Sequence, residues 1–207
     1  MNDMKLEKQI RFIVEIDKLK QVYRKTKILD RTRYENDAEH SWHLAMMAII
    51  LAEYANDRSV DIYKVLKLLL IHDLVEIDAG DTYAYDSTGQ SSKKEREIKA
   101  AQRLFSLLPE DQGLELMSLW EEYDLHNTME ARFASALDKL QPLLFNHLND
   151  GEIWKENNIT SNMVIERNER IALGSESLWE YAQRIINTSI EQGILESSTE
   201  KRDQPDK

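Results

Sequence analysis

The sequence predicts an all-α fold, a single-domain helical bundle, and three observations lead to this prediction. The chain has 207 residues, of which 42% are hydrophobic, and this suits one compact domain with a sizeable core. It contains only 6 Gly and 3 Pro, while helix-favouring Leu, Glu, Lys, Ala and Ile dominate. Apolar residues recur at spacings of three and four, as they do on one face of a helix.

The first half of the chain supplies three expected helices. Apolar residues at helical spacing over residues 4–23 predict an amphipathic helix, which a basic connection follows. A second helix is expected from about Asp37 to Tyr54, with Asn36 or Asp37 as its N-cap. Residues 61–76 are apolar on nearly every side, which is typical of a buried helix.

The second half begins with a polar run, residues 86–94, for which we expect a mobile loop. Apolar periodicity then resumes and predicts further helices at about residues 92–108, 109–123, 128–148, 161–173 and 175–191. The last residues, 193–207, are polar and are expected to form a disordered tail. The domain is therefore expected to span residues 1–192.

Composition narrows the classes of function. Cysteine is absent, so any metal must be held by nitrogen and oxygen ligands. A net charge of -11 argues against binding to a nucleic acid polymer, and the absence of a long apolar run predicts a cytoplasmic protein without a membrane partner. The connection between Lys18 and Arg33 is nevertheless rich in Lys and Arg. It is either a solvated basic loop or a local anion trap.

Four residues on predicted helices are candidate metal ligands. His72 and Asp73 close the most apolar helix, where an uncompensated charge is costly, and Glu76 lies one turn further along the same face. His40 extends the apolar stripe of the second helix, and Asp138 interrupts the stripe of the helix over residues 128–148. Each carboxylate in such a place needs a cation or hydrogen-bond donors.

These four side chains can be explained separately or together. Separately, each is a satisfied core histidine or an aspartate paired with a buried basic residue. Together, two neutral imidazoles and two carboxylates carry a charge of -2, which one divalent ion cancels. Mn, Co, Fe, Ni and Zn all suit such a His2Asp2 site.

The order His40, His72-Asp73, Asp138 resembles the metal signature of the HD superfamily of phosphohydrolases. Three flanking features sharpen the resemblance: Glu39 before His40, Glu76 and Gly80-Asp81 after the dipeptide, and residues 136–140 around the last ligand. With these features the chain is similar to the branch that contains bacterial 5'-deoxynucleotidases and their eukaryotic HD-domain relatives. The resemblance runs from about Leu19 to Phe145.

The resemblance implies roles for individual residues. His40, His72, Asp73 and Asp138 would hold one divalent ion in an HD-type helical bundle that is usually dimeric. Glu76 would be the general acid or base, Asp81 with Thr82 would contact the sugar or the nucleophilic water, and Arg24 would orient the phosphate. The substrate would be a small phosphate ester, a (deoxy)nucleoside 5'-monophosphate.

The chain departs from the branch at two places in the expected substrate site. Lys25 stands where such deoxynucleotidases carry Trp, and Thr82-Tyr83-Ala84-Tyr85 replaces a Pro-containing turn. Selectivity for deoxyribose therefore stays open. Two alternatives also stay open: another HD hydrolase, such as a phosphodiesterase or a nucleotide polyphosphate hydrolase, and a non-catalytic metal-binding helical scaffold.

Three other histidines receive no ligand role from the sequence. For His43, one turn after His40, we expect a packing or supporting role. For His126 and His147, which have polar neighbours, we expect surface positions.

Overall fold

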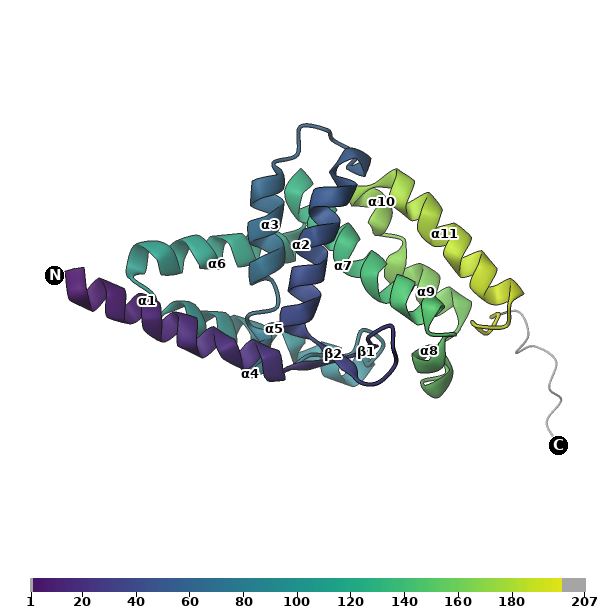
Figure 1. The fold of residues 1–207 in the computed structure, drawn as a ribbon, viewed down its shortest axis with the longest axis horizontal. Coiled ribbons are helices and arrows are strands. Elements are labelled where there is room, and N and C mark those ends of the chain that lie inside the picture. The colour runs from purple at the N-terminus through teal and green to yellow at the C-terminus, as the bar shows by residue number, and fades with distance from the viewer. Residues whose placement is uncertain (1, 199–207) are drawn as a thin grey trace.

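Helices make up nearly all of the structure, a computed structural model that describes residues 2–198 (Figure 1). In chain order the elements are α1 (Asn2–Ile16), η1 (Asp17–Gln21), β1 (Tyr23–Lys27), β2 (Tyr34–Asn36), α2 (Asp37–Leu51), η2 (Ala52–Tyr54), α3 (Ile62–Ile71), α4 (Glu76–Ala79), α5 (Ser87–Phe105), α6 (Glu110–Leu125), α7 (Met129–Leu148), α8 (Glu152–Glu156), α9 (Ser161–Asn168), α10 (Ile171–Gly174) and α11 (Glu176–Glu191). The all-α prediction is confirmed.

Polar side chains fix the starts of the main helices. Asn36 caps α2 in a capping box, in which its side chain accepts from the Glu39 backbone N–H while the Glu39 side chain accepts from the Asn36 backbone N–H. Asp61, Thr128 and Ser175 cap α3, α7 and α11 through the same kind of bond to a backbone N–H. These local signals place the helices that carry the candidate ligands.

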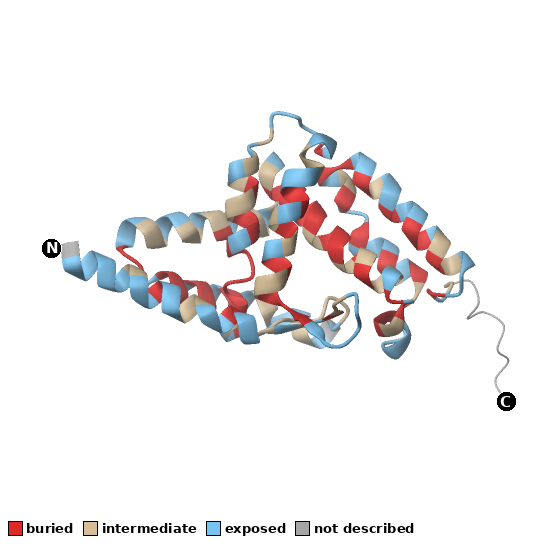
Figure 2. Ribbon diagram, viewed as in Figure 1, coloured by how far each residue is buried: buried red, intermediate tan, exposed pale blue. Residues whose placement is uncertain are grey.

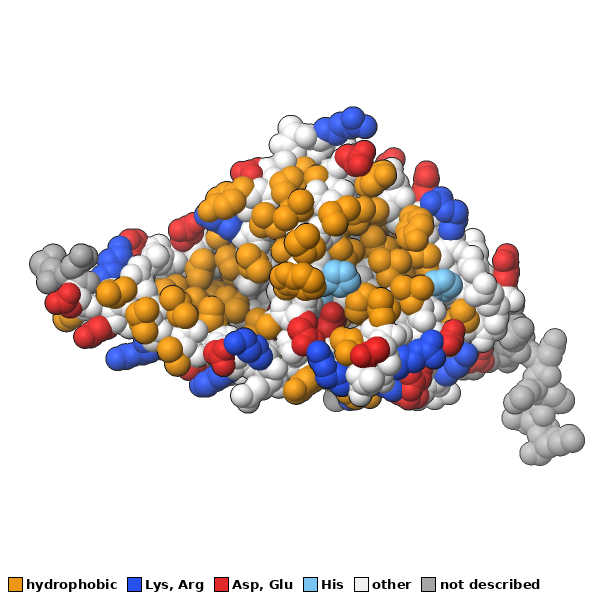
Figure 3. Space-filling model, in the orientation of Figure 1, with side chains coloured by type: hydrophobic (Ala, Val, Ile, Leu, Met, Phe, Trp, Pro, Cys, Tyr) orange, Lys and Arg blue, Asp and Glu red, His pale blue; other side chains and the backbone are white. Residues whose placement is uncertain are grey.

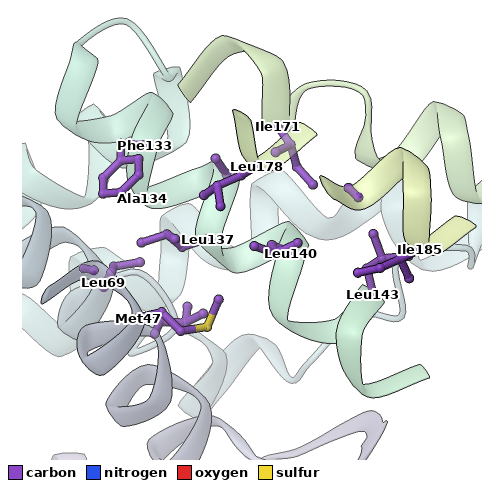
Figure 4. Packing of buried hydrophobic residues seen from close by; sticks show 14 of the residues in the cluster. Met47, Leu69, Phe133, Ala134, Leu137, Leu140, Leu143, Ile171, Leu178 and Ile185 are labelled. Atoms are coloured by element: carbon purple, nitrogen blue, oxygen red, sulfur yellow. The ribbon is translucent and has the colours of Figure 1, made fainter. Parts of the chain in front are cut away.

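The core consists of two clusters of buried apolar side chains. Figure 2 marks the buried residues along the helices in red. The first cluster fills the space between α2, α3, α7, α10 and α11, where Leu69, Leu137 and Ile171 are fully buried (Figure 4). The second is formed by residues of α1, α5 and α6 together with the end of α3, and Leu104 and Phe105 of α5 are almost fully buried in it. The C-terminal end of α3 contributes to both clusters, because Leu69 lies in the first and Ile71 in the second.

A close helix contact anchors α10 on α7. Gly174 ends α10, and a Cβ atom added there would lie 2.3 Å from the backbone oxygen of Arg132. Only a residue without a side chain permits this approach.

The structure corrects two expectations in the first half of the chain. The helix expected over residues 61–76 ends at Ile71, and a run of turns at residues 72–75 separates it from α4. The basic connection contains an antiparallel hairpin, in which Tyr23 pairs with Asn36 and Lys27 with Tyr34. Both features depend on packing between segments, which helical periodicity does not register.

Two expectations in the second half were also wrong. The loop expected over residues 86–94 is helical from Ser87, because the Asp86 side chain accepts from two backbone N–H groups and caps α5. Disorder was expected in the tail from residue 193, but Ile194 and Leu195 are buried in the first cluster. Residues 199–207 of that tail lie outside the described residues, and the domain boundary stays a prediction.

Across residues 2–198, the structure holds no helix whose length and apolar content would let it cross a membrane.

Candidate metal centre and active site

The four expected ligands meet at one point, although they come from three separate parts of the chain. His40 Nε2 lies 3.0 Å from Asp138 Oδ1, and His72 Nε2 lies 3.1 Å from Asp73 Oδ1 and 3.9 Å from Asp138 Oδ1. His40, His72 and Asp73 offer ligand atoms that all lie within 4.8 Å of one another. We call these four residues the metal-ligand cluster.

The turns after α3 bring two of the ligands together. His72 still donates its backbone N–H to the Leu68 carbonyl, as a helical residue would. The backbone then turns and starts α4 at Glu76, whose N–H bonds the Asp73 carbonyl at 2.9 Å. The break in the helix therefore allows two adjacent side chains to face the same point.

The hydrogen bonds of His72 indicate which of its nitrogens is free. Its Nδ1 lies 2.8 Å from the Leu69 carbonyl, which can only accept, so Nδ1 carries the hydrogen. In the neutral ring Nε2 then carries a lone pair and no hydrogen. This atom is buried, has no hydrogen-bond partner among the described residues, and faces the carboxylate of Asp73. Two lone pairs repel, so this arrangement needs either a proton or a cation between them.

Without a metal, the proton would take that place. Burial opposes charge on the ring, but the negative charges of Asp73 and Asp138 outweigh it and raise the pKa of His72 to about 10. With the imidazoles neutral, the two histidines and two aspartates match the His2Asp2 ligand set that holds a divalent ion.

His40 is oriented by a carboxylate that the sequence did not single out. Its Nδ1 lies 3.3 Å from Glu35 Oε2, and Glu35 is in turn held by Gln141 Nε2 at 2.8 Å. This arrangement, in which a carboxylate orients the far nitrogen of a histidine, is typical of metal sites. His43 Nδ1 lies 3.5 Å from Gln141 Nε2, and the His43 ring packs on Phe145. These contacts agree with the packing or supporting role expected for His43.

Arg24, on β1, lies inside the site. Its Nη1 donates to Asp73 Oδ2 at 2.9 Å and to Asp37 Oδ1 at 3.3 Å, while Asp138 and Glu35 lie 3.8 and 3.9 Å from other nitrogens of the group. Four carboxylates thus share one arginine. If all four are ionised and the imidazoles are neutral, the net charge is -3, and one arginine does not replace a divalent ion.

Asp37 was interpreted from the sequence only as a possible helix cap, but it joins Asp73 and Glu76 in a second buried group of acids. Burial and the charge of Asp73 raise the pKa of Asp37 to about 7. Burial, Asp73 and Asp37 hold the pKa of Glu76 well above its usual value. The sequence marks Asp37 only as a polar residue at the start of a helix, because its burial depends on the packing of the fold.

A hollow opens over these acids, and it brings the expected substrate residues together. Arg24, Lys25, Glu76, Asp81 and Thr82 all line it. Burial is the main cause that raises the pKa of Asp81. Arg96 from α5 donates to the Thr82 hydroxyl at 2.9 Å and also donates to the Ala79 carbonyl. These bonds hold the segment between α4 and α5 against α5.

A second hollow adjoins the first at the metal-ligand cluster and shares Asp73, Glu76 and Asp138 with it. Tyr123 lines it, donates its hydroxyl to Asp138 Oδ2 at 3.1 Å, and packs its ring 4.8 Å from that of His72. Burial and Asp138 raise the pKa of Tyr123 well above its usual value, so the hydroxyl stays a donor. The sequence reasoning missed this residue because its position relative to Asp138 depends on how α6 and α7 pack.

The surface positions expected for His126 and His147 were wrong. Both are half-buried, and His126 lines the second hollow. Its two nitrogens are engaged by the Asp124 carbonyl and the Ser135 hydroxyl, each at 2.8 Å, because α6 ends against α7 at this residue. His147 bonds the Ser189 hydroxyl of α11. Neither adds a free ligand to the cluster.

Comparison with protein families matches residues 16–179 to the HD domain model. The 5'-deoxynucleotidase HDDC2 of Bos taurus is 34% identical over 110 residues, which are 53% of this chain and 52% of that protein. The HDDC2 of Mus musculus is 31% identical over 136 residues, 65% of this chain and 66% of that protein. The matched region therefore spans between half and two thirds of these relatives.

Two solved structures are similar along nearly their whole length. The first, described as a "Predicted metal-dependent phosphohydrolase" from Magnetospirillum magnetotacticum MS-1, has 50% identity and a TM-score of 0.89, and the match covers 93% of this chain and 96% of that one. The second, a conserved hypothetical protein from Pyrococcus furiosus, has 26% identity and a TM-score of 0.58, with 88% and 99% covered.

Proposed function

Because the chain belongs to the HD domain family, we propose that it is a divalent-metal-dependent phosphohydrolase that acts on (deoxy)nucleoside 5'-monophosphates. The observation that carries the proposal is the bare Nε2 of His72, which faces two carboxylates inside a cluster with a surplus of negative charge. The name of the HDDC2 relatives supports the substrate class, and the description of the Magnetospirillum structure supports the reaction.

We propose that His40, His72, Asp73 and Asp138 hold one ion. When bound, a divalent ion supplies Lewis acidity, which polarises the phosphoryl group and acidifies water. Mn, Co, Fe, Ni and Zn remain the candidates, because the donors are nitrogen and oxygen atoms only.

Glu76 is the proposed general acid or base. A carboxyl group with a raised pKa can hold a proton near neutral pH and release it during the reaction. Asp81 lies in the same hollow and is proposed to assist at the water or the sugar, with Thr82 beside it. Arg24 keeps its proposed role of orienting the phosphate, and Lys25 lines the same hollow.

The base would occupy the apolar part of the first hollow, which Tyr83, Tyr85, Pro142, Leu143 and Trp154 line. Tyr83 and Tyr85 pack edge to face, with ring centroids 5.4 Å apart. Aromatic faces hold any base by stacking. We therefore expect broad acceptance of bases, and a panel of ribo- and deoxynucleotides decides the sugar preference.

The test combines metal content with turnover. His72→Ala and Asp73→Ala should lose both bound metal and phosphate release. Glu76→Gln should keep the metal and lose turnover by about 10²- to 10⁴-fold. Elemental analysis and a phosphate-release assay on ribo- and deoxynucleoside 5'-monophosphates, with each of several divalent ions, measure the two properties. A fully active Glu76→Gln protein would remove Glu76 from the chemistry.

We also propose that the protein is a homodimer. Trp42, Met46, Ile49 and Ile50 recur at helical spacing on the outer side of α2 and are exposed, although the opposite side of this helix is already in the core. Figure 3 shows a broad apolar surface on this face of the molecule. A helix apolar on all sides is normally buried, and large exposed patches mark interfaces.

A second copy of the chain is the proposed occupant of this face. Light scattering should give the mass of a dimer, and Ile50→Glu should give a monomer that keeps its metal. A monomeric wild-type protein would refute the proposed dimer. A cytoplasmic location is also part of the proposal, and cell fractionation tests it.

A further inference from the structure

The cavity beside the metal-ligand cluster has a basic side for which the proposed reaction gives no role. Lys93 of α5, Lys139 of α7 and Arg167 of α9 line both hollows beside the cluster. We call these three residues the basic rim. They come from three helices, so the packing of the helices brings them to one cavity.

The basic rim is poorly neutralised by the protein. Lys139 is 8% exposed, and the hydrogen bond of its Nζ goes to the neutral hydroxyl of Ser135 at 2.7 Å. The carboxylate paired with Lys93 is that of Glu97, at 3.4 Å. Within residues 2–198, no acidic group forms an ion pair with Arg167 inside 4.0 Å. A buried ammonium group without a carboxylate partner is costly unless a ligand compensates it.

Arg24 cannot supply all the positive charge that a phosphate requires. Its guanidinium group already faces four carboxylates at 2.9–3.9 Å. A phosphate monoester carries nearly two negative charges at neutral pH. Even with one divalent ion bound, the four carboxylates and Arg24 leave a net charge of -1, so further cations beside the cluster are needed to hold a phosphate there.

We propose that Lys93, Lys139 and Arg167 form an anion subsite that binds the phosphate group of the substrate and, after hydrolysis, inorganic phosphate. The nonbridging oxygens would accept hydrogen bonds from the three side chains while the phosphorus faces the metal-ligand cluster. This assignment rests on the proposed function, because it deepens the account of how a phosphate ester is held.

The test measures phosphate binding directly, using inorganic phosphate as the probe. Arg167→Ala, Lys93→Ala and Lys139→Met are titrated calorimetrically as metal-loaded proteins, and their metal content is determined in parallel. Each variant should bind phosphate about tenfold more weakly or worse, which is the loss expected for one charge-assisted hydrogen bond. Metal content should not change, and the KM for the nucleotide should rise more than kcat falls.

Arg170→Ala is the matched control. Arg170 is exposed, lies three residues after Arg167 and lines neither hollow, so its loss should leave phosphate binding unchanged. If Lys139→Met does not fold, Arg167→Ala and Lys93→Ala still decide the question.

The two proposals fail differently. If the wild type hydrolyses nucleotides and the rim variants keep its phosphate affinity and KM, the anion subsite is wrong and the proposed function stands. If the wild type binds phosphate but hydrolyses no phosphate ester, and Arg167→Ala binds phosphate more weakly, the subsite stands and the proposed function is wrong.

Discussion

Tyr123 should strengthen metal binding although it is not itself a ligand. Its hydroxyl donates to Asp138 Oδ2 at 3.1 Å, and its ring packs on His72. Tyr123→Phe removes the hydrogen bond and keeps the ring contact. The carboxylate then loses the donor that fixes its orientation toward the other ligands.

The expected loss follows from the kind of hydrogen bond removed. A hydrogen bond to a charged group contributes about 1.5–3 kcal/mol, and about 1.4 kcal/mol corresponds to a factor of ten in affinity. Tyr123→Phe should therefore weaken the binding of Mn²⁺ by about 10- to 100-fold, which is also typical for residues that orient metal ligands.

Calorimetric titration of the metal-free protein with Mn²⁺ measures this change. Tyr63→Phe is the matched control, because Tyr63 is 69% exposed on α3 and lies outside both hollows. Circular dichroism should show the same helical content in both variants. An unchanged Mn²⁺ affinity in Tyr123→Phe would refute the reasoning.

Three further predictions concern stability. A chelator should lower the thermal midpoint by roughly 5–10 °C relative to protein in metal at 100 times its Kd, because metal binding then stabilises the fold by about 2.7 kcal/mol. Equal midpoints in a fluorescence melt would contradict the metal site. In the metal-free protein Asp37→Asn should be stabilising at pH 8, since it removes a buried charge and its repulsion by Asp73. Urea titrations should show this gain shrinking below pH 7, where Asp37, with its pKa of about 7, is increasingly protonated. Gly174→Ala should destabilise the fold by about 1–3 kcal/mol in urea, because the new Cβ meets the Arg132 carbonyl, and an unchanged midpoint would show that α10 can move away.

The sequence by itself determined most of the helices and the four proposed metal ligands. Caps and apolar stripes depend on neighbours three or four residues away, so the cap at Asn36 and the helix starts near residues 61 and 128 could be predicted without knowledge of the fold. The same periodicity put His40 and Asp138 on inward faces. The family resemblance then supplied their proposed roles.

Only the tertiary structure decided what surrounds those residues. Gln141 and Glu35 are 106 residues apart, and Arg24 and Asp73 are 49 apart, yet each pair is in hydrogen-bond contact. The break after Ile71 and the hairpin of β1 and β2 likewise arise from contacts between segments. Local patterns carry no information about such distances, because the positions of side chains on different helices are set by how the whole core packs.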